Sequence, residues 1–460
     1  MIIRYLDPLE QLEFEIIQRT EQGDDASELS NAFKKIQSQP LELASLNARQ
    51  SLIELMATDK QSNPPSLTEP DELNAIMDAA KPAFVPETVQ TPLNEAELYN
   101  RILGGWLGRS AGCLLGKPVE RYQRPVLRKM LEANGTWPLD NYWTQNGMPD
   151  EILRKYPWKR RGGLASLREN IQYMPEDDDL NYTMLNLHVF ETHGENFNSE
   201  DLGTAWLAKL PVMELFTAER VAYFNLLAGH NAPESGLYIN PFREWIGAQI
   251  RADLWGYISP GKPQRAAEFA WRDARLSHSR NGIYGEMFFA ALIAEAFYES
   301  DIRTLVRAAL SCVPSESRFA KAINIVLELP LKEMQWEQVV DEIYHHFGHY
   351  HWVHTINNAA LTVAALLVGN GDLEKTICNV VMGGWDTDSN GATAGSIVGI
   401  INGATALPYK WIEPLNNRIR SSLGGFDNAQ FTDLASRTVA VIQSSSNQKS
   451  NAAVRQVDDF

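Results

Sequence analysis

Cysteine is scarce in this chain, and the few that occur are far apart. They are Cys113, Cys312 and Cys378 among 460 residues, and none forms a Cys-x-x-Cys pair. A disulfide framework is therefore not expected, and this usage fits a reducing compartment. On this ground we expect a cytoplasmic protein.

Positive charge and long apolar runs are also in short supply. Lys and Arg number 41 against 58 Asp and Glu, which gives a formal net charge of −17. Such an acidic surface disfavours non-specific binding to nucleic acid and to anionic membranes. The best apolar run, AALTVAALLVG from Ala359, is too short to span a bilayer, and the N-terminal stretch MIIRYLDPLEQLEFEIIQ lacks the apolar core of a signal peptide. Neither nucleic acid nor a membrane is expected as a partner.

Alternation of apolar and polar residues with a period of two is rare, whereas apolar spacings of three and four are common. These spacings occur in EAELYNRILGGWLGRSAGCLLG, LNYTMLNLHVFETHG, GEMFFAALIAEAFYES and NNAALTVAALLVGNG. They predict an all-α domain over residues 96–440. A helical, polar extension at residues 1–55 and a Pro/Ser-rich linker at residues 56–95 precede it, and a disordered tail at residues 441–460 follows.

Two segments of this domain carry glycine at every fourth position. The first set is Gly104, Gly108, Gly112 and Gly116, and the second is Gly391, Gly395, Gly399 and Gly403. Because glycine inside a helix costs about 1 kcal/mol relative to alanine, eight of them would cost roughly 8 kcal/mol. That sum is comparable to the net stability of a domain. Close packing of two central helices through these faces would offset it; the alternative is that some of the glycines lie in loops.

An acidic segment lies beside an apolar helical pattern in PEDDDLNYTML, residues 175–185. Its four consecutive carboxylates are Glu176, Asp177, Asp178 and Asp179. They could simply form the acidic first turn of a helix on the surface, where the helix dipole favours negative charge. Alternatively they bind a hard cation, since Mg²⁺ prefers oxygen ligands.

A second acidic segment, GGWDTDSNGATAG, leads into the second glycine-stepped stretch. Asp386 and Asp388 could direct two carboxylates at one point, and Ser389 could add a hydroxyl ligand. Alone the motif is weak, because Asp and Ser also cap helices. Together with the first segment, it suggests one or two metal ions between helices.

Other motifs are less informative. GRSAG, around Ser110, matches the nucleophile elbow formally, but the residues before it predict a helix rather than the required strand. Five histidines crowd into HHFGHYHWVH at positions 345, 346, 349, 351 and 354, with no cysteine or His-Glu-x-x-His motif nearby. Packing or substrate contact is favoured there over zinc. His278 stands alone before a helix, where a structural role is the default.

In their order and spacing, four of these stretches resemble the ADP-ribosylglycohydrolase family. The stretches are AGCLLGKPVE, EDDDLNYT, LSHSRNGIYGEMFFAALIAEAF and GGWDTDSNGATAGSIVGIINGA, and the resemblance covers about residues 96–415. It implies a compact orthogonal all-α bundle with a dinuclear Mg²⁺ centre, or sometimes Mn²⁺, between central helices. It also implies hydrolysis of a ribosyl bond, most simply that of a small-molecule or protein-linked ADP-ribose.

The resemblance also implies roles for individual residues. The implied metal ligands are Glu176, Asp177, Asp178, Asp386, Asp388 and Ser389, with Ser in place of the family's Thr. A shift by one position would instead pair Asp178 with Asp179. Asp178 and Glu120 are the implied catalytic carboxylates. The implied substrate contacts are Gly116, Asp179, His278, Trp385 and Asn390.

The chain also departs from the family pattern. Cys113 replaces an aspartate, Trp385 is inserted after the paired glycines, and carboxylates replace hydroxyl ligands in the first acidic segment. The alternatives to ADP-ribosyl hydrolysis are therefore cleavage of another N- or O-glycoside, a catalytically idle metal-binding protein such as a lens crystallin of this family, and a metal-free helical scaffold.

Overall fold

The two glycine-stepped segments form two helices, α5 (Glu95–Gly116) and α20 (Thr387–Asn402), which pack directly on each other. The computed structural model describes residues 4–62, 68–81, 91–159 and 162–457. A Cβ on Gly104, Gly108 or Gly112 would come closer than 3.0 Å to the carbonyl oxygen of Gly399, Gly395 or Gly391, respectively. The predicted packing of two central helices is thus confirmed. Gly403 differs, since it ends α20 with a φ of 71°.

This pairing is antiparallel, so the N-terminus of α20 lies beside the C-terminus of α5. The hydroxyl of Thr387 donates a hydrogen bond of 2.8 Å to the carbonyl of Gly116. The backbone N–H of Arg121 donates to the carbonyl of Trp385 at 3.0 Å. The second acidic segment is therefore placed next to the residues that follow α5.

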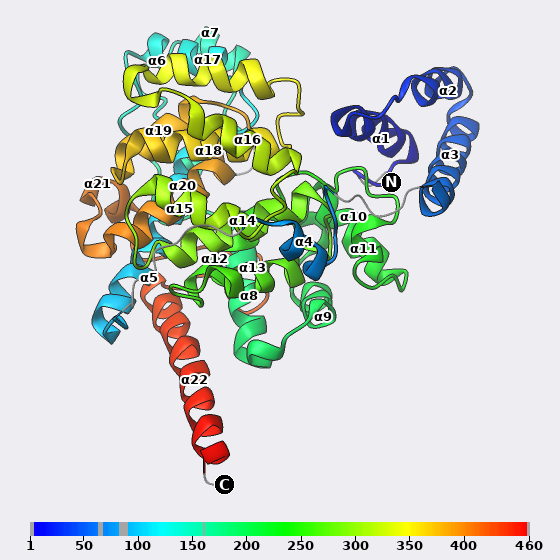
Figure 1. The fold of residues 1–460 in the computed structure, drawn as a ribbon. Coiled ribbons are helices and arrows are strands. Elements are labelled where there is room, and N and C mark those ends of the chain that lie inside the picture. The colour runs from blue at the N-terminus through cyan, green and yellow to red at the C-terminus, as the bar shows by residue number, and fades with distance from the viewer. Residues whose placement is uncertain (1–3, 63–67, 82–90, 160–161, 458–460) are drawn as a thin grey trace.

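Two further helices, α14 (Asn281–Glu295) and α18 (Thr355–Gly369), run through the interior near α20 (Figure 1). Every residue of α14 is buried. A helix that is buried on all sides belongs to the centre of a large core rather than to its surface. The described residues form helices and isolated bridges but no sheet, which confirms the predicted all-α fold.

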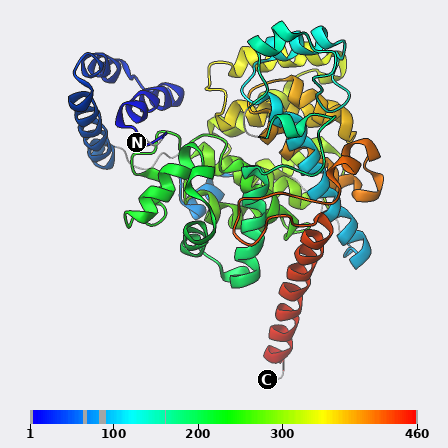
Figure 2. The same cartoon turned by 180° about the vertical axis from the view of Figure 1, so that it is seen from behind.

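The remaining helices of the main body surround this centre (Figures 1 and 2). They are α6 (Arg124–Asn134), α7 (Asp150–Lys155), α8 (Asp178–His193), α9 (Ser199–Lys209), α10 (Thr217–Leu227), α11 (Glu234–Leu237), α12 (Ala252–Tyr257), α13 (Pro263–Ala274), α15 (Ile302–Leu310), α16 (Arg318–Glu328), α17 (Trp336–Phe347), α19 (Leu373–Met382) and α21 (Tyr409–Ile412). Within the described residues, none of the helices has the length and apolar character that crossing a membrane would require.

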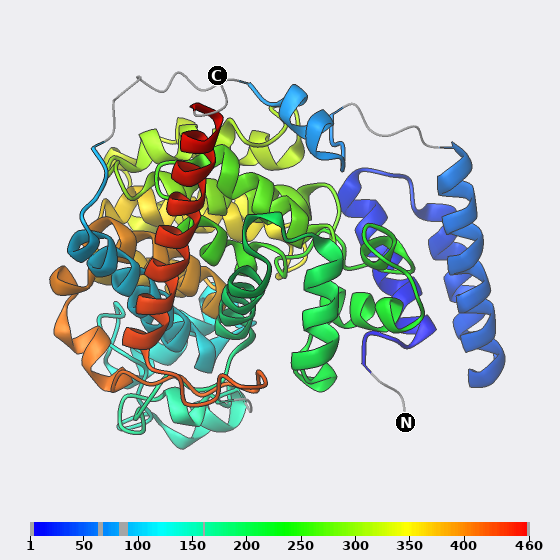
Figure 3. The same cartoon turned by 90° about the horizontal axis from the view of Figure 1, so that it is seen from below.

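The N-terminal extension contains four helices, α1 (Pro8–Gln22), α2 (Ser27–Gln37), α3 (Leu41–Ser62) and α4 (Leu73–Ala79). The first three gather at one side of the molecule, next to α10 and α11 (Figure 3). They share a small core that includes Leu12, Phe33 and Leu52. Helix α3 continues past residue 55, and α4 lies within the segment expected to be a linker. Residues 63–67 and 82–90 of that segment lie outside the described residues.

The last helix, α22 (Phe431–Val457), projects from the body (Figure 2). Leu434, Ala435 and Val439 in its first turns are buried against the main core. The backbone of the helix is described to Val457. The packed first turns provide a nucleus, and adding residues to an existing helix is easier than starting one. Residues 458–460 lie outside the described part of the chain.

Candidate active site

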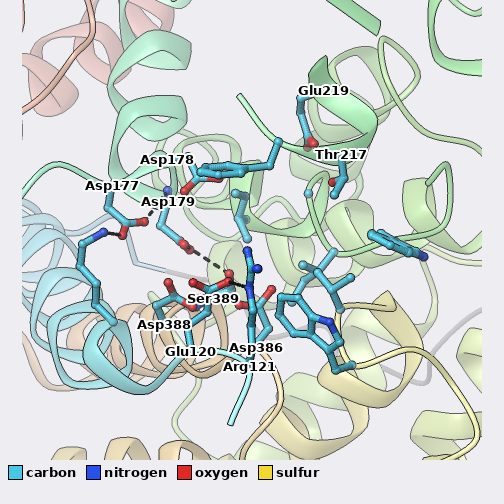
Figure 4. A pocket seen from close by; sticks show the side chains of 18 of the residues that line it. Glu120, Arg121, Asp177, Asp178, Asp179, Thr217, Glu219, Asp386, Asp388 and Ser389 are labelled. Atoms are coloured by element: carbon cyan, nitrogen blue, oxygen red, sulfur yellow. Dashed lines mark hydrogen bonds and ion pairs between the residues drawn. The ribbon is translucent and has the colours of Figure 1, made fainter. Parts of the chain in front are cut away.

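A cavity of about 420 Å³ opens where three segments meet: the residues after α5, the N-terminus of α8 and the N-terminus of α20. The first acidic segment comes from α8 and the second from α20 (Figure 4). Both N-termini carry partial positive charge, which makes them favourable places for carboxylates. The two acidic segments, in which Asp179 and Ser389 are 210 residues apart in sequence, thus face one space.

Carboxylates crowd one end of this cavity, where Asp178, Asp386, Asp388 and Glu120 all contribute to the wall. Burial raises the pKa of Asp388 to about 7, and repulsion from Glu120 and Asp177 adds to the shift. Burial and neighbouring carboxylates also raise the pKa values of Asp178 and Asp386 well above the ordinary range. This concentration of negative charge favours a bound cation.

Two of the consecutive aspartates are already paired with cations of the protein. The ammonium of Lys117 forms a buried ion pair with Asp177, whose carboxylate also caps α8 by accepting the N–H of Asp179 at 3.0 Å. Arg109 donates to the backbone carbonyl of Asp179 at 2.7 and 3.1 Å, and to its carboxylate at 3.3 Å. Arg109 itself is fixed by a 2.7 Å ion pair with Asp253.

Asp178, in contrast, lines the cavity, and its carboxylate makes no hydrogen bond within the part of the chain that the structure describes. Ser389 connects the two acidic segments, because its hydroxyl donates to Asp179 at 3.3 Å. Glu176 lies at the edge of the cavity and accepts hydrogen bonds from Asn181 and Ser422. Among the four consecutive carboxylates, Asp178 is therefore the one most available to a ligand.

Two sets of acidic side chains lie at or beside the cavity, and one of them is already neutralised by cations of the protein. Asp178, Asp386 and Asp388 offer oxygen ligands around one cavity. Cys113, Asp177 and Asp179 also bring potential ligand atoms within 4.8 Å of one another, but Lys117 and Arg109 already neutralise that group. Burial raises the pKa of the Cys113 thiol well above its usual value. Sulfur is also a soft ligand, which suits zinc or copper(I) rather than Mg²⁺.

The opposite end of the cavity is aromatic. Trp245 and His351 stack with ring centroids 4.4 Å apart and an interplanar angle of 6°. Burial, followed by the charge of Arg121, lowers the pKa of His351 to about 4, so its ring is neutral at physiological pH. Arg121 connects the two ends, because its guanidinium lies 5.1 Å from the centre of the Trp352 ring and is paired with Glu120 at 3.1 Å. One cavity therefore combines an oxygen-rich end with an aromatic end.

Four predicted substrate contacts do not line this cavity, and only Asp179 does. Trp385 is buried and stacks on Tyr344 of α17, with centroids 4.3 Å apart. His278 is buried and shares a hydrogen bond with the Ser277 hydroxyl. Direct contact with a ligand in the cavity is therefore not available to either ring.

The other two belong to the framework behind the cavity. Gly116 is packed against the backbone of Thr387, so its lack of a side chain allows α5 and α20 to meet. Asn390 donates to the amide oxygen of Asn358 at 2.7 Å, and the same oxygen accepts the backbone N–H of Asp386 at 3.3 Å. Asn390 thus helps to position Asp386 without facing the ligand space.

The less informative motifs also have structural explanations. Ser110 is buried within α5, which is not the strand-to-helix turn of a nucleophile elbow. Among the described residues, the histidines form no three-residue group suited to a metal. His354 caps α18 by accepting the N–H of Ile356 at 3.1 Å.

Several cavity residues are not predicted from the sequence. Lys117 lies inside the quoted AGCLLGKPVE stretch, but no local pattern marks it as the partner of Asp177, which is 60 residues away. Glu219, whose pKa burial raises to about 7 against the opposing effect of Arg251, has no recognisable motif. Arg4, Tyr5 and Phe14 come from the extension. Their contribution depends on long-range packing that no local pattern reveals.

Comparison with known proteins gives a consistent result. Residues 94–448 match the model of a family described as ADP-ribosylglycohydrolase, which is well over half of the chain. A solved structure described as an ADP-ribosylglycohydrolase-related protein complex has a similar fold, with a TM-score of 0.50 and 20% sequence identity. That likeness covers 76% of this chain and 99% of the other. A search of the curated proteins found no match.

Proposed function

Because the chain belongs to the ADP-ribosylglycohydrolase family and is therefore a glycosidase, we propose that it hydrolyses an ADP-ribosyl adduct with the help of Mg²⁺. The bond cleaved is the N- or O-glycosidic bond at C1″ of the ribose. The observation that carries the proposal is the convergence of two acidic segments, at the N-termini of α8 and α20, on one cavity.

The proposed ion is bound by the carboxylates of Asp178, Asp386 and Asp388, with the hydroxyl of Ser389 nearby. These are oxygen donors, which Mg²⁺ prefers and Mn²⁺ also accepts. When bound, the ion would orient ribose hydroxyls and a water molecule. We propose one ion at this set rather than two, because Asp177 is paired with Lys117 and Asp179 with Arg109.

The protein's own groups perform the remaining tasks. Cleavage of a glycosidic bond passes through an oxocarbenium-like transition state, which nearby carboxylates stabilise. Asp178, whose carboxylate lines the cavity, is proposed to take the proton of the attacking water and to pass it to the leaving nitrogen or oxygen, while the water oxygen bonds to C1″ and the glycosidic bond breaks. Glu120, whose carboxylate accepts a 3.1 Å hydrogen bond from Arg121, is proposed to orient the ribose from the other side.

The test is release of free ADP-ribose from ADP-ribosyl-arginine and ADP-ribosyl-serine peptides, with Mg²⁺ and with a chelator. Asp388→Asn keeps the shape of the side chain but removes its charge. We expect kcat/KM to fall at least about a hundredfold, the usual scale for loss of a group that stabilises charge in the transition state. Glu42→Ala, a change at an exposed carboxylate of α3, is the matched control and should retain full activity.

Retention of full metal-dependent activity by Asp388→Asn would contradict the proposed site. Metal uptake by the parent protein without release of ADP-ribose from either peptide would instead favour another glycoside substrate or an idle metal-binding protein. A melting temperature that neither Mg²⁺ nor chelator changes would favour a scaffold without a metal.

A further inference from the structure

The N-terminal extension contributes to the wall of the cavity, although it lies outside the residues that match the family model. Arg4, Tyr5 and Phe14 line the same space as Asp178 and Asp388. Residues outside the family domain can give this chain a ligand preference that the domain alone does not provide. We infer that Arg4 and Phe14 bind the adenosine-diphosphate end of the substrate. This inference rests on the function proposed above.

The extension is fixed to the main body by specific contacts. Glu15 forms a two-pronged ion pair with Arg243, with N–O distances of 2.6 and 3.1 Å. The amide of Gln22 donates to Glu244 at 3.0 Å. Arg318 donates to the backbone carbonyl of Glu21, also at 3.0 Å. Because α1 is fixed at both its middle and its C-terminal end, it can present side chains to the cavity in a defined position.

Phe14 belongs to the aromatic end of the cavity. Its ring is half-buried and meets Trp245 edge-on at a centroid distance of 5.3 Å. It also meets His351 edge-on at 5.8 Å, and His351 is stacked on Trp245. Aromatic rings of this kind bind a flat nucleobase by stacking or edge contacts. The half-exposed ring of Phe14 is thus suited to a base that enters the cavity.

Guanidinium groups accompany these rings. Arg4 is exposed at the cavity and lies 4.8 Å from the centre of the Tyr5 ring. Arg121 lies over Trp352 on the wall contributed by the main domain, but its guanidinium is paired with Glu120. Arginine binds phosphate oxygens with paired hydrogen bonds, so the exposed guanidinium of Arg4 beside these aromatic rings matches a phosphate group joined to a base.

The two ends of the cavity therefore select the orientation of the substrate. The carboxylate end would repel phosphates, whereas it accommodates ribose hydroxyls and a cation. The aromatic end offers the charge and the flat surfaces that an adenosine diphosphate needs. In this orientation the amino-acid side chain that carries the ADP-ribosyl group, the acceptor, points out of the cavity. The extension then recognises the nucleotide rather than the acceptor.

The test measures the binding of ADP-ribose and of ADP to the full-length protein by calorimetry at fixed Mg²⁺ concentration. Arg4→Gln removes an exposed charge, and Phe14→Leu keeps an apolar side chain while removing the ring. Each should raise the Kd for both ligands at least about fivefold, and should raise KM for an ADP-ribosyl peptide with kcat within about twofold. Phe33→Leu, at a buried phenylalanine of the extension's own core, is the matched control and should leave both Kd values unchanged.

The outcomes separate the inference from the function on which it rests. Unchanged Kd values in Arg4→Gln and Phe14→Leu, with normal binding by the parent protein, would overturn the inference and leave the proposed function intact. Weaker binding of substrate peptide with unchanged binding of ADP would also overturn it, because the extension would then contact the acceptor. A parent protein that neither binds ADP-ribose nor hydrolyses an adduct would overturn both.

Discussion

Lys117 determines which of the clustered carboxylates remain open to a ligand. Its ammonium is buried against Asp177, close to Cys113 and Asp179. Removing one partner of a buried ion pair leaves an uncompensated charge, which commonly costs about 3–5 kcal/mol. The ammonium of Lys117 thus neutralises Asp177, a role that a second metal ion would otherwise have to fill.

Replacement of Lys117 by methionine should therefore have two effects. The metal-free protein should lose about 3–5 kcal/mol of stability because Asp177 is left unpaired. Added Mg²⁺ should raise the melting temperature of the variant more than that of the parent, since Asp177 becomes open to a cation. Thermal melts over a series of Mg²⁺ concentrations measure both effects.

Lys117→Arg retains the charge and serves as the control, with a Mg²⁺ response close to that of the parent. Equal Mg²⁺-dependent shifts in Lys117→Met and in the parent would show that Lys117 does not compete with a cation.

The sequence predicts the two acidic segments but not the roles within them. Glu176 through Asp179 are four adjacent carboxylates, so the family motif can be aligned with them in two ways that differ by one residue. Their assignment depends on Lys117 and Arg109, which are about 60 to 70 residues away in sequence. Trp385 looks like a ligand contact in its motif, and only the presence of Tyr344 on α17 explains why its ring lies elsewhere.

At the level of secondary structure, the contact between α5 and α20 holds the site together. Its glycine faces were recognisable from their spacing, because nothing but close packing compensates for glycine inside a helix. Asp386 directly precedes α20 and Asp388 lies in its first turn, while Lys117 and Glu120 follow the C-terminal end of α5. A change in the spacing of these helices would therefore move the two halves of the carboxylate cluster apart.

Gly112→Ala should destabilise the protein strongly. Its Cβ would meet the backbone oxygen of Gly391 at less than 3.0 Å, and backbone atoms cannot rotate away as a side chain can. We expect a loss of about 3 kcal/mol or more, at the upper end for overpacking, together with loss of activity. Chemical denaturation of the purified variant measures the loss.

Gly203→Ala, in α9, is the matched control. There the nearest atoms belong to the flexible side chains of Leu226 and Leu276, at 3.3 Å and beyond. Alanine favours helix by up to about 1 kcal/mol, so this variant should be as stable as the parent or slightly more so. Similar losses in both variants would mean that the helix contact is not the cause.

At the scale of the whole molecule, the N-terminal extension is docked on the main body. The sequence does not predict this docking. The polar helical pattern of residues 1–55 indicates helices, and the structure contains them. Their position depends on contacts such as Glu15 with Arg243, in which the partners are 228 residues apart. No local pattern encodes such a pairing, so the contribution of Phe14 to the cavity could not be anticipated.

One docking contact depends on pH. Glu21, near the end of α1, accepts the backbone N–H of His351, and burial raises its pKa to about 7, against an ordinary value of 4.5. Glu244 raises the pKa further, while the hydrogen bond from His351 and the charge of Arg318 oppose the shift. Between pH 4.5 and 7 the folded protein keeps this proton while the unfolded chain loses it. Stability therefore falls as the pH rises through this range.

Glu21→Gln should remove this pH dependence, because the amide oxygen can still accept the N–H of His351. At pH 8 the variant should be more stable than the parent by up to roughly 3 kcal/mol, and at pH 4.5 the two should be similar. Denaturation curves at several pH values measure the difference. A difference that stays constant from pH 4.5 to 8 would exclude titration of Glu21 as the cause.

The pairing of α5 with α20 also has a consequence for synthesis of the protein. Gly116 and Thr387, which touch in the folded protein, are 271 residues apart. At roughly 5–20 residues per second, α5 leaves the ribosome on the order of half a minute before its partner helix exists. During that interval its glycine face has no matching surface, and the nascent chain holds Glu120 and the first acidic segment but neither Asp386 nor Asp388. The active site can therefore form only after most of the polypeptide has been made.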